Sequence, residues 1–190
     1  MRRYFSILIA AGLAVMPWLA WAKPGVQVER EHNVFQIRVE VPVAVDARTA
    51  WRVLTDYNHL AEFVPGMRSS RVISAAGAPL RVEQKGEIGF LFFIRNFEVV
   101  LEVEEIPPML LKFHATGGDM KRMQGEWRIH AGAETVDIEY QAEIEPDFWV
   151  PPLIGTALMR RDIRKNVEGV VQEMLRRYAA ARKDAAAPSP

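Results

Sequence analysis

Apolar and polar residues alternate along most of the chain between residues 80 and 144. At the start of this segment, Leu80 and Val82 fall on one side of an extended backbone, while Arg81 and Glu83 fall on the other. The same two-residue period returns in three later stretches, at residues 97–103, 123–129 and 136–144. A period of two is typical of strands in a sheet with one solvated face and one apolar face. The apolar face needs another element to cover it.

Seven strands follow from this alternation and from the positions of the turns. They are predicted at residues 34–41, 68–74, 80–88, 95–105, 110–115, 122–130 and 135–145. Two short helices separate the first two strands, one at 47–54 with Asp46 as its N-cap and one at 57–63 that Pro65 and Gly66 stop. Strands at this spacing, joined by short turns, favour an antiparallel meander.

A long amphipathic helix is predicted at residues 153–182. Its apolar residues recur at steps of three and four, and its charged residues occupy the other faces. We expect this helix to cover the sheet, which gives an α+β fold with a curved, seven-stranded antiparallel sheet around one helix. Such an arrangement often encloses a ligand cavity. Residues 184–190 have no apolar face to bury and are predicted to be disordered.

The first residues have the features of an export signal. Two arginines precede an apolar stretch over residues 4–19 and the small-x-small sequence Ala20-Trp21-Ala22. We therefore predict a signal peptide at 1–22, a single domain at 23–183 and a periplasmic or secreted protein. An uncleaved membrane anchor is the alternative, since the apolar stretch is nearly long enough to span a bilayer.

Composition excludes several classes of function. The 190-residue chain has no net charge at pH 7, and loss of the signal with its two arginines leaves it slightly acidic. A nucleic-acid partner normally requires a basic patch, so none is expected. The chain has no cysteine, which excludes thiolate metal sites. It also has no histidine pair at metal-ligand spacing and no glycine-rich phosphate loop, so we predict no metal and no cofactor.

The order of these elements resembles the helix-grip fold of the START/Bet v 1-like (SRPBCC) superfamily. Two runs carry the resemblance, Ala50-Trp51-Arg52-Val53-Leu54-Thr55-Asp56-Tyr57 and Phe63-Val64-Pro65-Gly66-Met67. Both are similar to the helix-helix-strand entry of the coenzyme Q-binding group, and residues 148–164 resemble exported members of the polyketide cyclase/dehydrase group. The resemblance implies a deep apolar cavity between sheet and helix. It is specific for fold rather than function, because this superfold hosts carriers, cyclases and hydrolases alike.

Three residues on the apolar side of the strands are candidate ligand contacts. Gln84 interrupts an apolar strand face with an amide, and a buried amide needs a partner such as a ligand carbonyl or hydroxyl. Trp127 and Tyr140 combine a large apolar body with one polar tip. The alternatives are that Gln84 meets water at an open end of the sheet and that the two aromatic residues belong to the ordinary core.

The resemblance adds Met159, Ile163 and Val167 as the helix side of the cavity, with ordinary core packing as the alternative. Two apolar loops provide the remaining candidates, which are Phe92, Phe148 and Trp149. Large apolar residues in loops fit a cavity mouth, a membrane surface or a protein partner. The alternative is that the two loops pack on each other, or that residues 90–94 are buried strand.

Catalytic signals are weak, and we predict no catalytic residue. Asp56 and His59 lie three residues apart, which fits an acid–base pair, but capping of a helix end by Asp56 is the commoner role. The basic residues between 160 and 165 fit either anionic lipid head groups or the solvated side of the helix.

Together these observations predict a periplasmic carrier of a hydrophobic small molecule, such as a lipid, an isoprenoid quinone or a polycyclic aromatic compound. We expect a monomer that makes transient contact with a membrane surface and binds no nucleic acid. A cyclase- or dehydratase-like enzyme that uses the same cavity is one alternative. An envelope protein-interaction module without a cavity is another.

Overall fold

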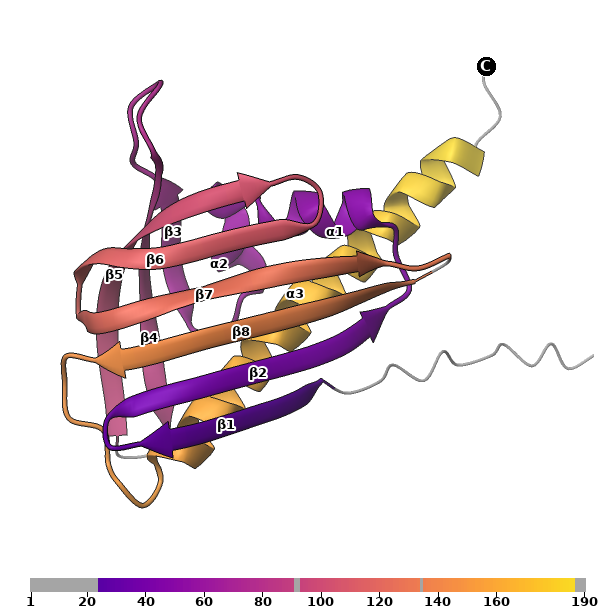
Figure 1. The fold of residues 1–190 in the computed structure, drawn as a ribbon. Coiled ribbons are helices and arrows are strands. Elements are labelled where there is room, and N and C mark those ends of the chain that lie inside the picture. The colour runs from indigo at the N-terminus through magenta and orange to yellow at the C-terminus, as the bar shows by residue number, and fades with distance from the viewer. Residues whose placement is uncertain (1–23, 91–92, 134, 187–190) are drawn as a thin grey trace, which may run out of the picture.

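The strands of the protein form one antiparallel sheet (Figure 1) in a computed structural model that describes residues 24–90, 93–133 and 135–186. They are β1 (Gly25–Glu31), β2 (Val34–Val43), β3 (Met67–Val72), β4 (Leu80–Phe90), β5 (Phe93–Ile106), β6 (Leu110–Gly118), β7 (Met120–Ala131) and β8 (Val136–Pro146). Their order is β1-β2-β8-β7-β6-β5-β4-β3. Six strands from β3 to β8 therefore form a meander, and β2 pairs with its last strand.

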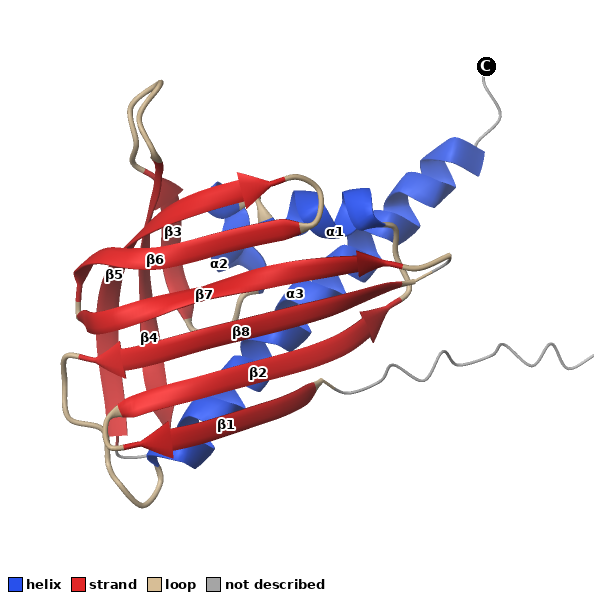
Figure 2. Cartoon of the chain, in the orientation of Figure 1, coloured by secondary structure: helices blue, strands red, loops and turns tan. Residues whose placement is uncertain are grey.

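The helices lie on one face of this sheet (Figure 2). They are α1 (Ala47–Leu54), the 3-10 turn η1 (Tyr57–His59), α2 (Leu60–Phe63) and the long α3 (Gly155–Ala186). Asp46 begins α1 as expected, since its Oδ1 accepts a hydrogen bond from the Thr49 backbone N at 2.6 Å. The predicted helix-grip arrangement is confirmed. No helix within the described ranges is long and apolar enough to cross a membrane.

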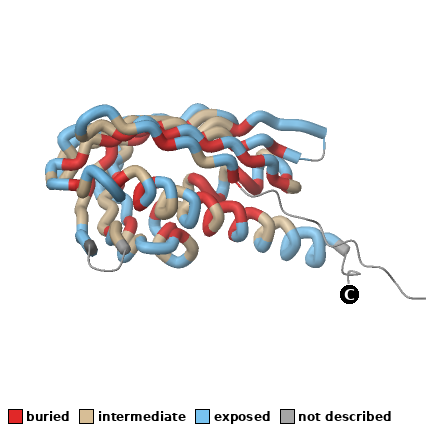
Figure 3. Tube along the Cα trace, turned by 90° about the horizontal axis from the view of Figure 1, so that it is seen from below, coloured by how far each residue is buried: buried red, intermediate tan, exposed pale blue. Residues whose placement is uncertain are grey.

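The core lies between the sheet and α3, where the inner sides of both layers are buried (Figure 3). In β2, every second residue from Phe35 to Val43 is buried, and the residues between them are exposed. On α3, Val167, Val171 and Met174 are almost fully buried against this face. The alternation read from the sequence therefore marks the inner face correctly in the strands that it identifies.

The sheet has eight strands rather than the predicted seven, because β1 is not among the strands that the sequence predicts. β1 is an edge strand in which only Val28 is buried, so its apolar pattern is short. The hairpin to β2 turns at His32, which has a φ of 56°, and lacks the Asn-Gly or Asp-Gly pair that identifies such turns in a sequence.

The tail predicted to be disordered from residue 184 is helical to Ala186. Residues 185 and 186 are both alanine, the residue that favours a helix most, so the end of α3 extends beyond its last buried contact. Figure 1 shows this end of α3 projecting past the edge of the sheet.

Gly169 allows α3 to lie close to the end of α2 and the residues that follow it. A Cβ added at this position would lie 2.2 Å from the Phe63 carbonyl oxygen and 2.8 Å from Pro65 Cδ. The nearer obstacle is backbone and cannot rotate away. The glycine thus fixes how closely α3 approaches this segment, and Val64 and Pro65 also contribute to the wall of the cavity described below.

We predict that Gly169→Ala destabilises the protein by roughly 1–2 kcal/mol. The substitution gains about 1 kcal/mol of helix propensity, but overpacking costs about 1–3 kcal/mol, and contact with a backbone oxygen places the cost near the upper end of that range. Urea unfolding monitored by circular dichroism measures the difference. Gln172→Ala, at an exposed position of the same helix, is the control and should change the unfolding free energy by less than about 0.5 kcal/mol. A Gly169→Ala variant as stable as wild type would contradict the prediction.

Candidate ligand-binding site

A cavity of about 380 Å³ lies between the sheet and α3. Strands β4 to β8 contribute residues of their inner faces, so the same alternation that builds the core also directs side chains into the cavity. α3 closes the opposite side, and the segment from Leu60 to Met67 adds a third wall. The wall is mainly apolar, as expected for a small-molecule site.

Seven of the nine residues proposed from the sequence contribute to this wall. They are Gln84, Trp127, Tyr140, Phe148, Met159, Ile163 and Val167. Trp149 does not, and it is 69% exposed in the loop before α3. Phe92 lies outside the described residues. Two adjacent loop residues that the sequence treats alike therefore differ in position: Phe148 lies in the cavity wall and Trp149 lies on the surface.

The inner face of the sheet carries polar groups that have no protein partner. Within the described residues, neither the Gln84 amide nor the Tyr140 hydroxyl, both in the cavity wall, makes a hydrogen bond. Ser70, the Cα partner of Gln84 across β3 and β4, is only 6% exposed, and its hydroxyl also lacks a partner. A buried polar group is normally hydrogen-bonded, so the Ser70 hydroxyl is unusual, whereas the half-buried Gln84 and the Tyr140 hydroxyl border the cavity. Gln84 and Tyr140 are positioned to recognise a polar atom of a bound molecule.

An aromatic cluster forms the part of the wall that β6, β7 and β8 contribute. The Trp127 and Tyr140 ring centroids lie 4.4 Å apart, and the Phe113 and Tyr140 rings are stacked at 6.2 Å. Burial raises the pKa of the Tyr140 hydroxyl, so this group is neutral at physiological pH and keeps its proton for donation. The cluster offers flat apolar surface beside one hydrogen-bond donor.

The rim of the cavity, where α3 meets the end of β4, is polar. Arg161 Nη1 donates to the Gly89 carbonyl oxygen at 3.1 Å, and the Gly89 backbone N donates to Asp162 Oδ2 at 3.3 Å. Both side chains, together with Glu87 and Lys165, contribute to the cavity wall. Two consecutive residues of α3 therefore bind both backbone groups of one residue in β4.

The sequence places the residues of this rim on the solvated side of α3 and does not reveal that they contribute to a cavity wall. The sequence feature that indicates the rim is a single carboxylate, Asp162, among four basic residues. Burial raises the pKa of Asp162 above its ordinary value, and the bond from Gly89 and the charges of Arg161 and Lys165 only partly oppose the effect. Asp162 is thus a titratable group of the rim whose charge is easily removed by acid.

Asp56 and His59 form a pair, but they do not belong to the cavity wall. His59 Nδ1 lies 2.6 Å from Asp56 Oδ1, and Arg177 Nη2 donates to Asp56 Oδ2 at 2.7 Å. Burial acts to raise the pKa of Asp56, but these two bonds outweigh it and lower the pKa. The capping role expected for the Asp56 side chain is wrong, since it makes no cap bond. The pair instead ties η1 to α3.

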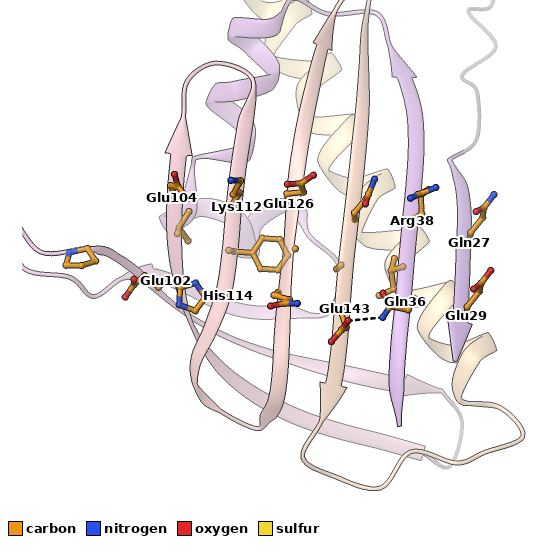
Figure 4. A pocket seen from close by; sticks show the side chains of 18 residues that line it. Gln27, Glu29, Gln36, Arg38, Glu102, Glu104, Lys112, His114, Glu126 and Glu143 are labelled. Atoms are coloured by element: carbon orange, nitrogen blue, oxygen red, sulfur yellow. Dashed lines mark hydrogen bonds between the residues drawn. The ribbon is translucent and has the colours of Figure 1, made fainter. Parts of the chain in front are cut away.

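A larger and shallower hollow of about 1,170 Å³ lies on the outer face of the sheet (Figure 4). Figure 4 shows its lining as charged and amide side chains that project from neighbouring strands, including Glu126 and Lys112. Gln36 Nε2 donates to Glu143 Oε2 at 2.9 Å across the hollow's floor. This is the solvated face that the alternation predicts. Within the described ranges, no three His, Asp or Glu side chains are grouped so that they could hold a metal ion.

Comparison with known protein families identifies the chain. The family model described as polyketide cyclase/dehydrase and lipid transport matches residues 43–171, more than half of the chain. The chain belongs to this family. The match begins at the end of β2 and runs into α3, so it covers most of the elements that form the cavity. The superfamily resemblance drawn from the sequence is confirmed. No curated protein matches the chain.

Solved structures from several organisms share the fold. The Zhui aromatase/cyclase from Streptomyces sp. R1128 is 16% identical with a TM-score of 0.62 over 76% of this chain and 95% of its own. A STAR-related lipid transfer protein fragment from Xanthomonas axonopodis is 14% identical with a TM-score of 0.61 over 79% and 98%. A protein from Thermus thermophilus, TTHA0849, is 18% identical with a TM-score of 0.61 over 74% and 97%. At these identities the likeness shows the fold alone.

We predict that Asp162→Asn stabilises the protein at pH 7 and has no such effect near pH 3. A carboxyl whose pKa is higher in the folded protein than in the unfolded chain costs stability once pH rises through that folded pKa. The amide removes the cost and still accepts the bond from Gly89. Thermal unfolding of both proteins from pH 3 to pH 7 measures the difference, which should grow with pH. A difference that is constant with pH would contradict the raised pKa.

Proposed function

We propose that the protein is a periplasmic carrier that holds a hydrophobic small molecule in the cavity between the sheet and α3. The observation that carries the proposal is an apolar cavity of about 380 Å³ with the unpartnered side chains of Gln84 and Tyr140 in its wall. Burial of apolar ligand surface supplies affinity at roughly 25 cal/mol per Å² before ordering costs. The two polar groups would orient the ligand through a carbonyl or hydroxyl oxygen. The export signal predicted at residues 1–22 supports the location.

The size of the cavity narrows the class of ligand. Small-molecule sites span about 300–1,000 Å³, and about 380 Å³ is near the lower end of that range. A water molecule occupies roughly 30 Å³ in the liquid, so the cavity has room for on the order of a dozen groups of that size. A compact polycyclic aromatic or a single-chain lipid fits this volume, and a two-chain lipid exceeds it. The Trp127–Tyr140–Phe113 cluster favours a planar ring over a chain.

A cyclase-like enzyme is the second candidate, and one observation favours it. Asp162 is a carboxyl at the cavity rim whose raised pKa suits proton transfer. Such an enzyme also fits the family description, and the Zhui aromatase/cyclase shares the fold. The two candidates differ in the fate of the bound molecule. A carrier releases it unchanged, whereas a cyclase or dehydratase releases a product of altered structure or mass.

Filling the cavity should abolish binding. Native mass spectrometry of residues 23–190, which contain every element of the fold, should show a stoichiometric apolar adduct after purification from the source cells. In Met159→Trp and Ile163→Trp the larger side chain occupies the ligand's space, and the adduct should disappear. Gln172→Trp, on the exposed side of α3, is the matched control and should retain the adduct. Adduct retained in both cavity variants, with circular dichroism unchanged, would place the site elsewhere.

The polar groups of the wall should affect affinity without supporting the fold. Gln84→Leu and Tyr140→Phe each remove one hydrogen bond to the ligand, worth about 0.5–1.5 kcal/mol, so the dissociation constant should rise about 2- to 12-fold. The unfolding free energy of the ligand-free protein should stay the same or increase, because an unpartnered polar group is removed from the interior. Isothermal titration with the molecule identified by mass spectrometry measures the first effect, and urea unfolding measures the second. Unchanged affinity in both variants would show that these groups do not contact the ligand.

A further inference from the structure

Two large apolar side chains project into solvent from the loop between β8 and α3. Leu153 is 98% exposed and Trp149 is 69% exposed. Isolated exposed apolar residues are common, but two such residues close together on one loop form a patch that water solvates poorly. Ile94, 62% exposed at the start of β5, lies at the same end of the sheet. We call Trp149, Leu153 and Ile94 the apolar tip.

The loop that carries most of the apolar tip is firmly held. Arg30 in β1 donates to two of its carbonyl oxygens, that of Pro151 at 3.1 Å and that of Val150 at 3.2 Å. Val150 itself is buried in the core, and two prolines stiffen the segment that follows it. Trp149 and Leu153 therefore flank a buried anchor and are presented outward by an ordered backbone. A loop whose backbone is already fixed loses little conformational entropy on binding.

Several basic side chains near the apolar tip are complementary to an anionic surface. Arg164 and Lys165 are exposed in the N-terminal half of α3, next to the cavity rim, and form no ion pair within the described residues. Arg95, beside Ile94 in β5, lies over the Phe148 ring at 5.2 Å. Two acidic side chains at this end are already engaged, since Glu87 pairs with Arg68 and Asp147 lies 4.0 Å from Lys121. Cations thus stand beside exposed apolar side chains.

We propose that this end docks on an anionic lipid bilayer. Trp149 and Leu153 insert between the head groups, and Arg164, Lys165 and Arg95 contact the lipid phosphates. A bilayer fits better than a protein partner, because the tip is small and has cations around it. Phe148 connects the two surfaces, since it contributes to the cavity wall and directly precedes Trp149. Docking therefore places the cavity rim against the membrane. This last step rests on the proposed carrier function, because it gives an apolar ligand a path that avoids water.

Sedimentation with vesicles tests the proposal. Residues 23–190 are mixed with vesicles of phosphatidylcholine alone, or of phosphatidylcholine with roughly 30% phosphatidylglycerol to give an anionic surface. We expect the protein to pellet with the anionic vesicles only, and less so at high salt. Trp149→Ser/Leu153→Ser should reduce the partition coefficient by about tenfold or more. Arg164→Glu/Lys165→Glu should reduce it comparably.

Matched controls come from the opposite end of the molecule. Ile73→Ser/Met109→Ser removes two exposed apolar side chains near the start of β4 and the end of β5, and Arg182→Glu/Lys183→Glu reverses two charges at the far end of α3. Both double variants should pellet as wild type does. Wild-type protein that stays in the supernatant with both vesicle types overturns the proposal, as does equal loss in the tip and control variants. The test uses no ligand, so its failure leaves the proposed carrier function to be judged by the cavity variants alone.

Discussion

One helix has to cover the apolar face of a sheet that is wider than the helix. Eight strands spaced about 4.8 Å apart make a sheet roughly 35 Å across, whereas a helix with its side chains is about 10–12 Å wide. Curvature brings the strands toward α3, and α1, η1 and α2 fill part of the remaining space (Figures 1 and 2). The space that is left is the cavity. Its position between strands β4 to β8 and α3 therefore follows from the architecture, and its chemistry depends on the inward side chains.

The inward side chains are predictable because strands have a strict period. Once β4 and β8 are recognised, the alternation decides that Gln84 and Tyr140 face α3 and that Glu83 and Glu139 do not. The three- and four-residue period of α3 likewise places Met159, Ile163 and Val167 on the covered side. β1 escapes prediction because an edge strand with one buried residue has almost no period to detect. Periodicity thus identifies strands that are buried on one face along most of their length.

The loops and the rim are less predictable for a related reason. No period relates neighbouring residues in a loop, so Phe148 and Trp149 look equivalent although one contributes to the cavity wall and the other is exposed. The rim depends on contacts between residues far apart in the chain, such as Asp162 with the Gly89 backbone. In the sequence, Asp162 is one charge among several on a helix. Its partial burial comes only from the place where β4 ends against α3.

The unpartnered groups at Gln84 and Tyr140 have a consequence for the lifetime of the protein. An empty cavity leaves their hydrogen-bonding capacity unused, whereas a bound molecule that satisfies them stabilises the folded state by thermodynamic linkage. Occupied molecules then unfold less often than empty ones. Because proteases act mainly on opened chains, the empty form is degraded faster. The abundance of the protein would in this way follow the supply of a molecule that fills its cavity, without any dedicated regulator.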